Sequence, residues 1–169
     1  MTSPDTVTKA AEIAPHSRLA EVIASRADLF ALTQDTETAA LRPRQPGGLS
    51  HAERAALACR IARLNNALPL AAYYEQNLDA IGSTAVLRQI ADPGHTSVND
   101  ARLAALLRHV DLVTTAPKNA SQADIQALSQ AGLSDADIVR LSELIAFVNY
   151  QLRLIAGLRL MGTRAEQTA

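Results

Sequence analysis

The sequence is poor in aromatic residues and has no tryptophan, since phenylalanine, tyrosine and tryptophan together make up 3% of its 169 residues. Hydrophobic residues nevertheless make up 48% of the chain, too many for a disordered protein, so a core must be built mainly from alanine, leucine, isoleucine and valine. Alanine and leucine favour helices, whereas the β-branched residues that strands prefer are sparse. The composition therefore predicts an all-α fold.

The chain also lacks the features that mark several other classes of protein. Its formal net charge is -1 and its arginines are scattered, so we expect no basic face for nucleic acid. It has no run of about 18 apolar residues, so we expect no membrane span. A signal peptide is not recognisable at its start, and one cysteine cannot form an internal disulfide, so the cytoplasm is the expected location.

No pattern typical of a metal site or a bound cofactor is present. Four histidines are scattered over the chain, without the spacing or the acidic neighbours of a metal site: His16, His51, His95 and His109. The glycines do not form a phosphate-binding fingerprint. We therefore expect neither a metal ion nor a cofactor.

Capping signals predict where most of the helices begin. A serine followed three residues later by an acidic residue caps a helix N-terminus. Pro69 suits the first turn of another helix, and Gly132 suits a left-handed helix end. Four capping serines fit this pattern: Ser50, Ser97, Ser121 and Ser134.

The same signals divide the chain into three parts. Residues 1–16 are small and polar and are predicted to form a flexible N-terminal arm. Residues 17–162 are predicted to form one helical domain, and residues 163–169 a C-terminal tail. Within the domain, we expect a helix over residues 17–30 and a shorter one over residues 35–41.

The last predicted helix, over residues 134–161, is apolar on two faces. Such a helix lies either at the centre of its own bundle or against another subunit. We therefore predict a homo-oligomer, most simply a two-fold dimer. The first face contains Ile138, Leu141, Ile145, Val148, Leu152 and Ile155, and the second contains Leu144, Phe147, Leu154 and Leu158.

Two segments of the chain resemble one known family. LSHAERAALACRIARLNNALPLAAYY (residues 49–74) is similar to the alkylhydroperoxidase D and carboxymuconolactone decarboxylase (CMD) superfamily. LSQAGLSDADIVRLSELIAFVNYQLRLIAGLRLMG (residues 128–162) resembles the C-terminal helices of the peroxidase-related branch of that superfamily. The resemblance covers roughly residues 17–162, and it implies an alkylhydroperoxidase D-like helical bundle with an N-terminal helical extension.

Active members of that superfamily carry the pattern Glu-x11-Cys-x-x-Cys-x3-His, in which the cysteine pair reduces a hydroperoxide and becomes a disulfide. This chain has Ala55, Ala67, Leu70 and Tyr74 at the four positions. Its single cysteine, Cys59, lies in the middle of a predicted helix, where we expect it to be buried. The resemblance therefore implies a protein that lacks the Cys-x-x-Cys motif and its peroxidase chemistry.

Five polar residues are candidates for a small-molecule pocket that remains: Glu53, Asn66, Tyr73, Tyr74 and Arg153. The tyrosine hydroxyls could bind or protonate a ligand, or they could serve packing and a subunit contact. Glu53 completes the capping box that begins at Ser50. Arg153 needs a partner if it is buried, either an acidic residue such as Glu53 or an anionic ligand.

Two functions stay open at this point. The first is a CMD-domain protein without peroxidase residues that keeps a small-molecule pocket, in antioxidant-related or small-molecule metabolism. Any enzymatic activity would be that of a cofactor-free lyase or isomerase. The second is a non-catalytic structural or interaction protein that partners an active relative. A polar, closed cavity favours the first function, and a cavity plugged by Leu68, Leu70 and the tyrosines favours the second.

Overall fold

The fold is all-α, as the composition predicted. The computed structural model describes residues 5–96 and 98–166, and over these residues it contains nine α-helices, one 3-10 helix and no strand. The elements are α1 (Thr6–Ala10), α2 (Arg18–Ala24), α3 (Ala27–Leu41), α4 (His51–Leu64), α5 (Leu68–Ile81), α6 (Ala85–Ala91), α7 (Ala101–Thr115), η1 (Pro117–Asn119), α8 (Gln122–Gln130) and α9 (Asp135–Glu166).

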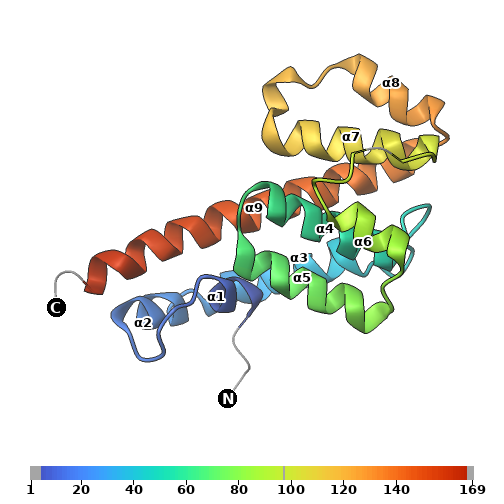
Figure 1. Ribbon diagram of the computed structural model, residues 1–169. Coiled ribbons are helices and arrows are strands. Elements are labelled where there is room, and N and C mark those ends of the chain that lie inside the picture. Colours follow the sequence, from blue (N-terminus) through green and yellow to red (C-terminus); the bar gives the residue numbers. More distant parts are fainter. Residues whose placement is uncertain (1–4, 97, 167–169) are drawn as a thin grey trace.

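Helix α9 forms the long axis of the molecule (Figure 1), and it packs against α1, α2, α3, α4, α7 and α8. Both of its predicted apolar faces contribute buried residues, including Leu141 and Val148 on one face and Leu144 and Phe147 on the other. Residues 135–162 are also long and apolar enough to span a membrane, but 50% of the most apolar window is buried inside the molecule. Packing within the chain therefore accounts for the two apolar faces of α9.

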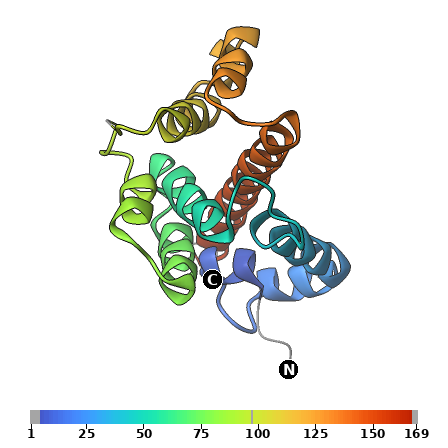
Figure 2. The same cartoon turned by 90° about the vertical axis from the view of Figure 1, so that its right-hand side faces the viewer.

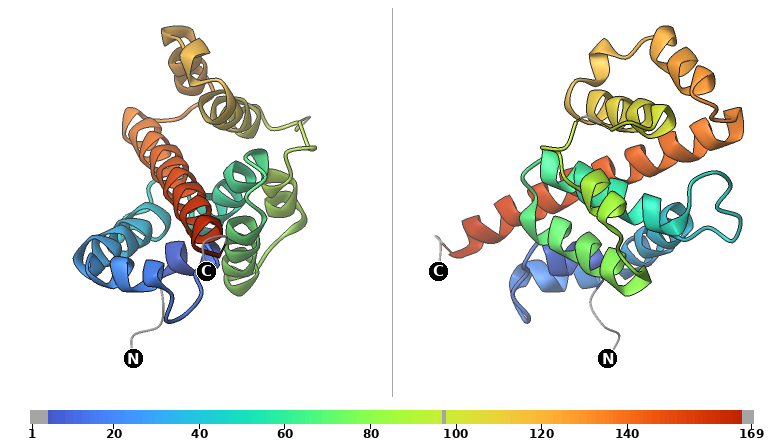
Figure 3. Two further views of the ribbon diagram at one scale, coloured as in Figure 1. Left: turned by 90° about the vertical axis from the view of Figure 1, so that its left-hand side faces the viewer. Right: turned by 45° about the vertical axis from the view of Figure 1, so that its right-hand side comes forward.

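The other helices lie along α9. Helices α7 and α8 pack together at one end of the molecule, and α1 and α2 lie at the opposite end (Figures 1 and 2). In the middle, α4 packs against α5, α6, α7 and α9 (Figure 3), and nine consecutive residues of α4, Arg54 to Ala62, are buried. Helix α4 is therefore the second central element, and the functional candidates on α5 lie directly against it.

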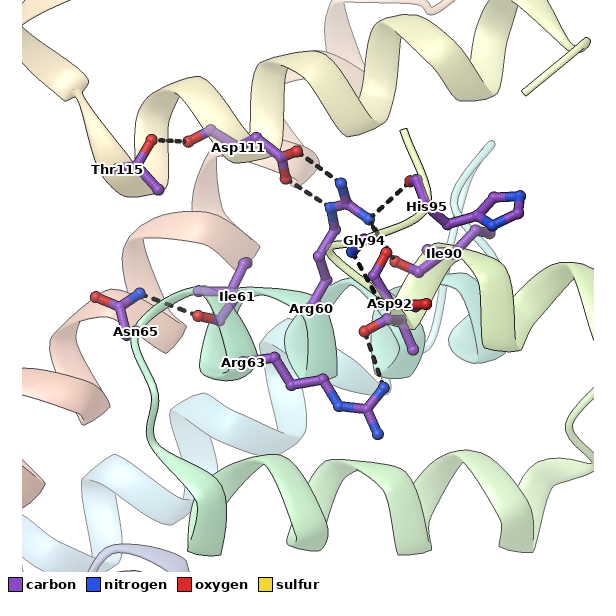
Figure 4. A network of polar contacts seen from close by, with 11 residues as sticks. Arg60, Ile61, Arg63, Asn65, Ile90, Asp92, Gly94, His95, Asp111 and Thr115 are labelled. Atoms are coloured by element: carbon purple, nitrogen blue, oxygen red, sulfur yellow. Dashed lines mark hydrogen bonds and ion pairs between the residues drawn. The ribbon is translucent and has the colours of Figure 1, made fainter. Parts of the chain in front are cut away.

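Two buried arginines on α4 fix the surrounding loops. Arg60 donates paired 2.6 Å hydrogen bonds to the carboxylate of Asp111 on α7, and it also reaches the carbonyl oxygens of Ile90, Asp92 and His95 (Figure 4). A charge without solvent contact needs such partners, because removal from water is costly. This network ties α4 to α7 and to the loop after α6.

Arg54 plays the same part for the segment before α4. Its guanidinium donates to three backbone carbonyls, those of Ala40, Pro46 and Leu49, at 2.9–3.0 Å. Residues 42–48 contain two prolines and two glycines and form no regular structure, as expected. Burial, the largest of several influences, lowers the pKa of Arg54 from its usual value. The irregular segment is thus held in place by hydrogen bonds from the Arg54 side chain.

The prediction of a flexible arm over residues 1–16 is wrong for the part that the structure describes. Asp5 caps α1 by accepting a hydrogen bond from the backbone N–H of Thr8, and Val7 and Ala10 are buried at 1% and 5% exposure. Residues 7, 10 and 11 have helical spacing, so even this short segment has an apolar face. That face packs on α5 and α9. Residues 1–4 lie outside the described part.

Most of the predicted helix starts are confirmed. Capping boxes are present at Ser50 and Ser121, Ser17 caps α2, and Ser134 Oγ accepts a hydrogen bond from the backbone N–H of Asp137 at the start of α9. Gly132 has the expected left-handed conformation, with φ at 90°. Local hydrogen bonding at a helix end depends on few residues, which explains why sequence patterns capture it well.

Four predicted boundaries were wrong. The helix expected over residues 17–30 is interrupted at residues 25 and 26, so that α3 begins at Ala27 and runs unbroken to Leu41. Asp100 caps α7, and Ser97, the predicted cap, lies outside the described residues. Helix α9 extends to Glu166, so the first part of the predicted tail at residues 163–169 is helical.

Candidate functional site

Three of the four residues at the positions predicted for the redox motif lie at the start of α5. Ala67 is the N-cap residue of α5, and Leu70 and Tyr74 follow within its first two turns. Leu70 and Tyr74 are both fully buried, while Leu68 is 70% exposed. A void of about 10 Å³ beside Tyr74 has room for about one water molecule. Packed side chains therefore fill this position, apart from that small void.

Cys59 is the only thiol, and it is buried as predicted. It lies on α4 and its Sγ is 3.6 Å from the carbonyl oxygen of Ala71 on α5. Burial, the largest influence, raises the pKa of Cys59 from 9.0 to about 11. A reactive cysteine needs a lowered pKa and access to solvent, and Cys59 has neither.

A buried polar cluster, here called the Glu37 cluster, joins α1, α3, α5 and α9 and consists of Thr6, Glu37, Tyr73, Tyr74 and Gln151. Oε1 of Glu37 accepts a 2.5 Å hydrogen bond from the Tyr73 hydroxyl, and Oε2 accepts a 2.7 Å bond from Nε2 of Gln151. The Tyr74 hydroxyl donates to Oε1 of Gln151, and the Thr6 hydroxyl lies 3.2 Å from Glu37. Both carboxyl oxygens of Glu37 are therefore occupied.

The electrostatics of this cluster favour neutral phenols. Burial is the largest cause that raises the pKa of Tyr73 and of Tyr74, and for Tyr73 its bond to Glu37 is the second. Glu37 has 0% exposure, and among the described residues no cation forms an ion pair with it. A carboxyl group and a phenol joined by a short hydrogen bond can hold and exchange a proton. Among the described residues, the Glu37 cluster is therefore the candidate for acid–base chemistry.

Two helix faces bring the cluster together. The buried residues of α3 are Phe30, Thr33, Glu37 and Leu41, so that Glu37 continues an inward-facing helical stripe. On α9, Gln151 lies on the same stripe as other buried residues, at positions 144, 148 and 155. The helical spacing of both residues therefore directs them inward, but a pattern of apolar residues does not mark a polar side chain as buried.

The structure brings together two of the five predicted site residues, Tyr73 and Tyr74, whose ring centroids are 5.3 Å apart. Glu53 forms the capping box and an ion pair with Arg102 at 2.8 Å. Asn66 is exposed in the turn before α5 and has a left-handed backbone, with φ at 53°. Arg153 is exposed and donates to the carbonyl oxygen of Asn149, so it forms neither the expected ion pair with Glu53 nor a contact with the tyrosines.

Two larger hollows lie on either side of α3. The first, here called the α1–α3 pocket, has a volume of about 640 Å³ and is bordered by α1, α2, α3 and Tyr73 of α5. The second, the α3–α9 groove, has a volume of about 620 Å³, and its walls include Leu29, Leu32 and Phe147. Tyr73 thus connects the buried Glu37 cluster to the edge of the α1–α3 pocket. Pockets of this size are typical of small-molecule sites.

His109 is the buried histidine of α7. It has 6% exposure, and its Nδ1 is one of two buried side-chain polar atoms without a hydrogen-bond partner in the described part of the chain. Burial, which outweighs the opposing effect of Asp124, lowers the pKa of His109 from 6.5. No group of three or more metal-ligating side chains was found among the described residues.

Comparison with known proteins supports the fold. The chain resembles the crystal structure of an uncharacterized peroxidase-related protein from Silicibacter sp. TM1040, with a TM-score of 0.67 and 17% sequence identity over 78% of this chain and 68% of that chain. No protein-family model and no curated protein sequence matches the chain significantly. At this identity, the likeness concerns the fold alone.

Proposed function

We propose that the chain is an alkylhydroperoxidase D-like, CMD-type protein that has lost thiol peroxidase chemistry and keeps a pocket for a small molecule. One observation carries the proposal: Ala67 caps α5, where the family's first cysteine would lie, and buried Leu70 and Tyr74 stand at the positions of the second cysteine and the histidine. The fold likeness to a peroxidase-related protein supports the same assignment.

The remaining chemistry of such a protein would be proton transfer. The thiol route needs an accessible thiolate, and the buried Cys59 has a pKa of about 11. Tyr73 lies at the edge of the α1–α3 pocket and donates a hydrogen bond to the buried carboxyl group of Glu37, so this pair would carry the proton. An enzymatic function would therefore be of the cofactor-free lyase or isomerase type.

A specific observation also favours a second candidate, a structural or interaction protein that partners an active relative. The void beside Tyr74 measures about 10 Å³, and Leu70 and Tyr74 fill the position of the redox centre. A buried network whose polar groups are all hydrogen-bonded stabilises the fold and needs no catalytic role. The α1–α3 pocket is the feature that favours the first candidate over this one.

We further propose that the protein is cytoplasmic and forms a homo-oligomer, most simply a two-fold dimer. Apolar side chains that remain exposed on α9, Val139 at 57% and Tyr150 at 42%, support a second subunit, as does Leu32 at 63% in the wall of the α3–α9 groove. Light scattering after size exclusion tests the oligomer, and a monomer at micromolar concentration would contradict it.

Hydroperoxide turnover tests the principal proposal. Purified protein is mixed with cumene hydroperoxide and dithiothreitol, and peroxide loss is followed for the wild type, for Cys59→Ala and for an active dithiol peroxidase as the positive control. We expect both forms of this protein to match the rate without protein. Turnover by the wild type that is lost in Cys59→Ala would refute the loss of thiol chemistry.

A further inference from the structure

The α1–α3 pocket combines an apolar wall with a polar edge. Its wall is formed by Ile23, Ala24, Ala27, Phe30 and Ala31 from α2 and α3. Its polar edge is formed by Thr6 and Lys9 of α1, Gln34 of α3 and Tyr73 of α5. This combination of a hydrophobic surface with a few convergent polar groups is typical of sites for small organic ligands.

The hydrogen bonds at the polar edge leave one amide donor available to a ligand. Oε1 of Gln34 accepts from the backbone N–H of Thr6 at 3.0 Å, so that its amide nitrogen can still donate. The Tyr73 hydroxyl donates to Glu37, and its oxygen also interacts with the side chains of Thr6 and Asn77. The site thus offers the amide N–H of Gln34 close to the apolar wall.

Two charged residues, Asp5 and Lys9, lie at the edge of the α1–α3 pocket, and they differ in the contacts that they make. Both carboxylate oxygens of Asp5 are used by Thr8, through its backbone N–H at 2.9 Å and its hydroxyl at 2.7 Å. Lys9 is exposed, and within residues 5–96 and 98–166 it takes part in no ion pair. Asp5 keeps its negative charge but its oxygens are occupied, so the charged group that can contact a ligand directly at this edge is the Lys9 ammonium group.

We propose that the α1–α3 pocket binds a small monocarboxylic acid with an apolar body. The carboxylate lies at the ammonium group of Lys9 and the amide of Gln34, and the hydrocarbon part covers Phe30 and Ile23. An ion pair with a carboxylate is a charge-assisted hydrogen bond, which is stronger than a neutral one. This assignment rests on the proposed small-molecule function and adds the class of ligand.

Binding of octanoate to the full chain tests the assignment, with octanamide as the uncharged analogue of the same length. We expect saturable binding of octanoate by calorimetry at pH 7, about tenfold weaker in Lys9→Gln, because loss of one charge-assisted contact changes affinity by roughly that factor. Lys118→Gln is the matched control, since Lys118 of η1 is the only other lysine, and it should leave the affinity unchanged.

A second variant tests the position of the hydrocarbon part. Ala27→Leu adds bulk to the pocket wall at an exposed residue, so the fold should persist, and octanoate binding should weaken at least fivefold. Octanamide should bind more weakly than octanoate and should be insensitive to Lys9→Gln.

Three results would overturn the assignment: no octanoate binding, equal binding of octanoate and octanamide, or octanoate binding that is unaffected by both Lys9→Gln and Ala27→Leu. Binding of octanamide alone would refute the carboxylate but leave a small-molecule site in place. The proposed loss of thiol peroxidase chemistry is judged separately, by hydroperoxide turnover. The two failures are therefore distinguishable.

Discussion

The Tyr73 hydroxyl donates a 2.5 Å hydrogen bond to Oε1 of Glu37, a carboxyl group with 0% exposure. The pair joins α5 to α3, and Gln151 links it to α9. A buried polar group that lacks a partner is costly, so each member of this cluster depends on the others. The cluster, which also includes Thr6 of α1, therefore specifies how four helices meet, in addition to any role at the pocket.

Removal of one hydroxyl from this cluster should destabilise the protein. Tyr73→Phe leaves Oε1 of Glu37 with only the longer hydrogen bond from the Thr6 hydroxyl, and we expect the free energy of unfolding to fall by about 1–3 kcal/mol. In a Glu37→Gln background, the same substitution should cost at least about 0.5 kcal/mol less, because contacting residues couple. Urea unfolding of the four variants measures this coupling.

Tyr150→Phe is the control for that cycle, because the Tyr150 hydroxyl lies 3.2 Å from Thr33 on a side chain that is 42% exposed. It should change stability by no more than about 0.5 kcal/mol. Strict additivity of Tyr73→Phe and Glu37→Gln would show that the two side chains do not depend on each other.

Replacement of Arg60 by lysine should destabilise the protein, although it keeps the positive charge. The guanidinium of Arg60 satisfies both oxygens of Asp111 and three backbone carbonyls, and an ammonium group cannot reproduce this planar geometry. We expect Arg60→Lys to lower the free energy of unfolding by about 2–4 kcal/mol. Thermal and urea unfolding measure the loss.

The surface residue Arg88 is the matched control, since its side chain is 70% exposed and pairs with Asp79 at 3.5 Å. Arg88→Lys should be neutral within about 0.5 kcal/mol. An equal effect of both substitutions would contradict a structural role for the buried guanidinium.

The helical fold could be predicted from the sequence because helix starts and ends depend on nearby residues. Ser50 and Glu53 formed the predicted capping box, and Pro69 lies in the first turn of α5 as expected. The break between α2 and α3 was not predicted, because the two residues there, Ser25 and Arg26, are neither proline nor glycine. Long-range packing selects such a break, and a single sequence does not record it.

Only part of the candidate site could be predicted from the sequence. Tyr73 and Tyr74 stood out because tyrosine is rare in this chain, whereas Glu37 and Gln151 are ordinary surface residue types on helices. The predicted residue Arg153 is exposed, whereas Gln151 continues the spacing of buried residues along α9. The sequence signal for Glu37 and Gln151 is a polar residue at a position where the helical spacing points to the core.

His109 should make stability depend on pH. Its pKa is lowered from 6.5 in the folded protein by burial, so the unfolded chain takes up a proton first as the pH falls. Stability should therefore decrease as the pH falls below about 6.5, with a slope of at most about 1.4 kcal/mol per pH unit, until the folded pKa is passed. Urea unfolding between pH 8 and pH 5 measures this slope.

His109→Leu should flatten that profile, and it should not destabilise the protein at pH 7 by more than about 1 kcal/mol, because Nδ1 of His109 has no partner to lose. His16→Asn is the control, since His16 is exposed and asparagine tolerates its left-handed backbone. A profile for His109→Leu that matches the wild type would assign the pH dependence to other groups.

The most direct test of the account is the rate at which the native protein's thiol reacts with Ellman's reagent at pH 7. A rise in pKa from 9.0 to about 11 lowers the thiolate fraction of Cys59 about a hundredfold, and burial blocks access as well. We predict labelling at least about a hundredfold slower than in the urea-unfolded chain. Stoichiometric labelling of the folded protein at the unfolded rate would contradict the claim that this fold contains no reactive sulfur.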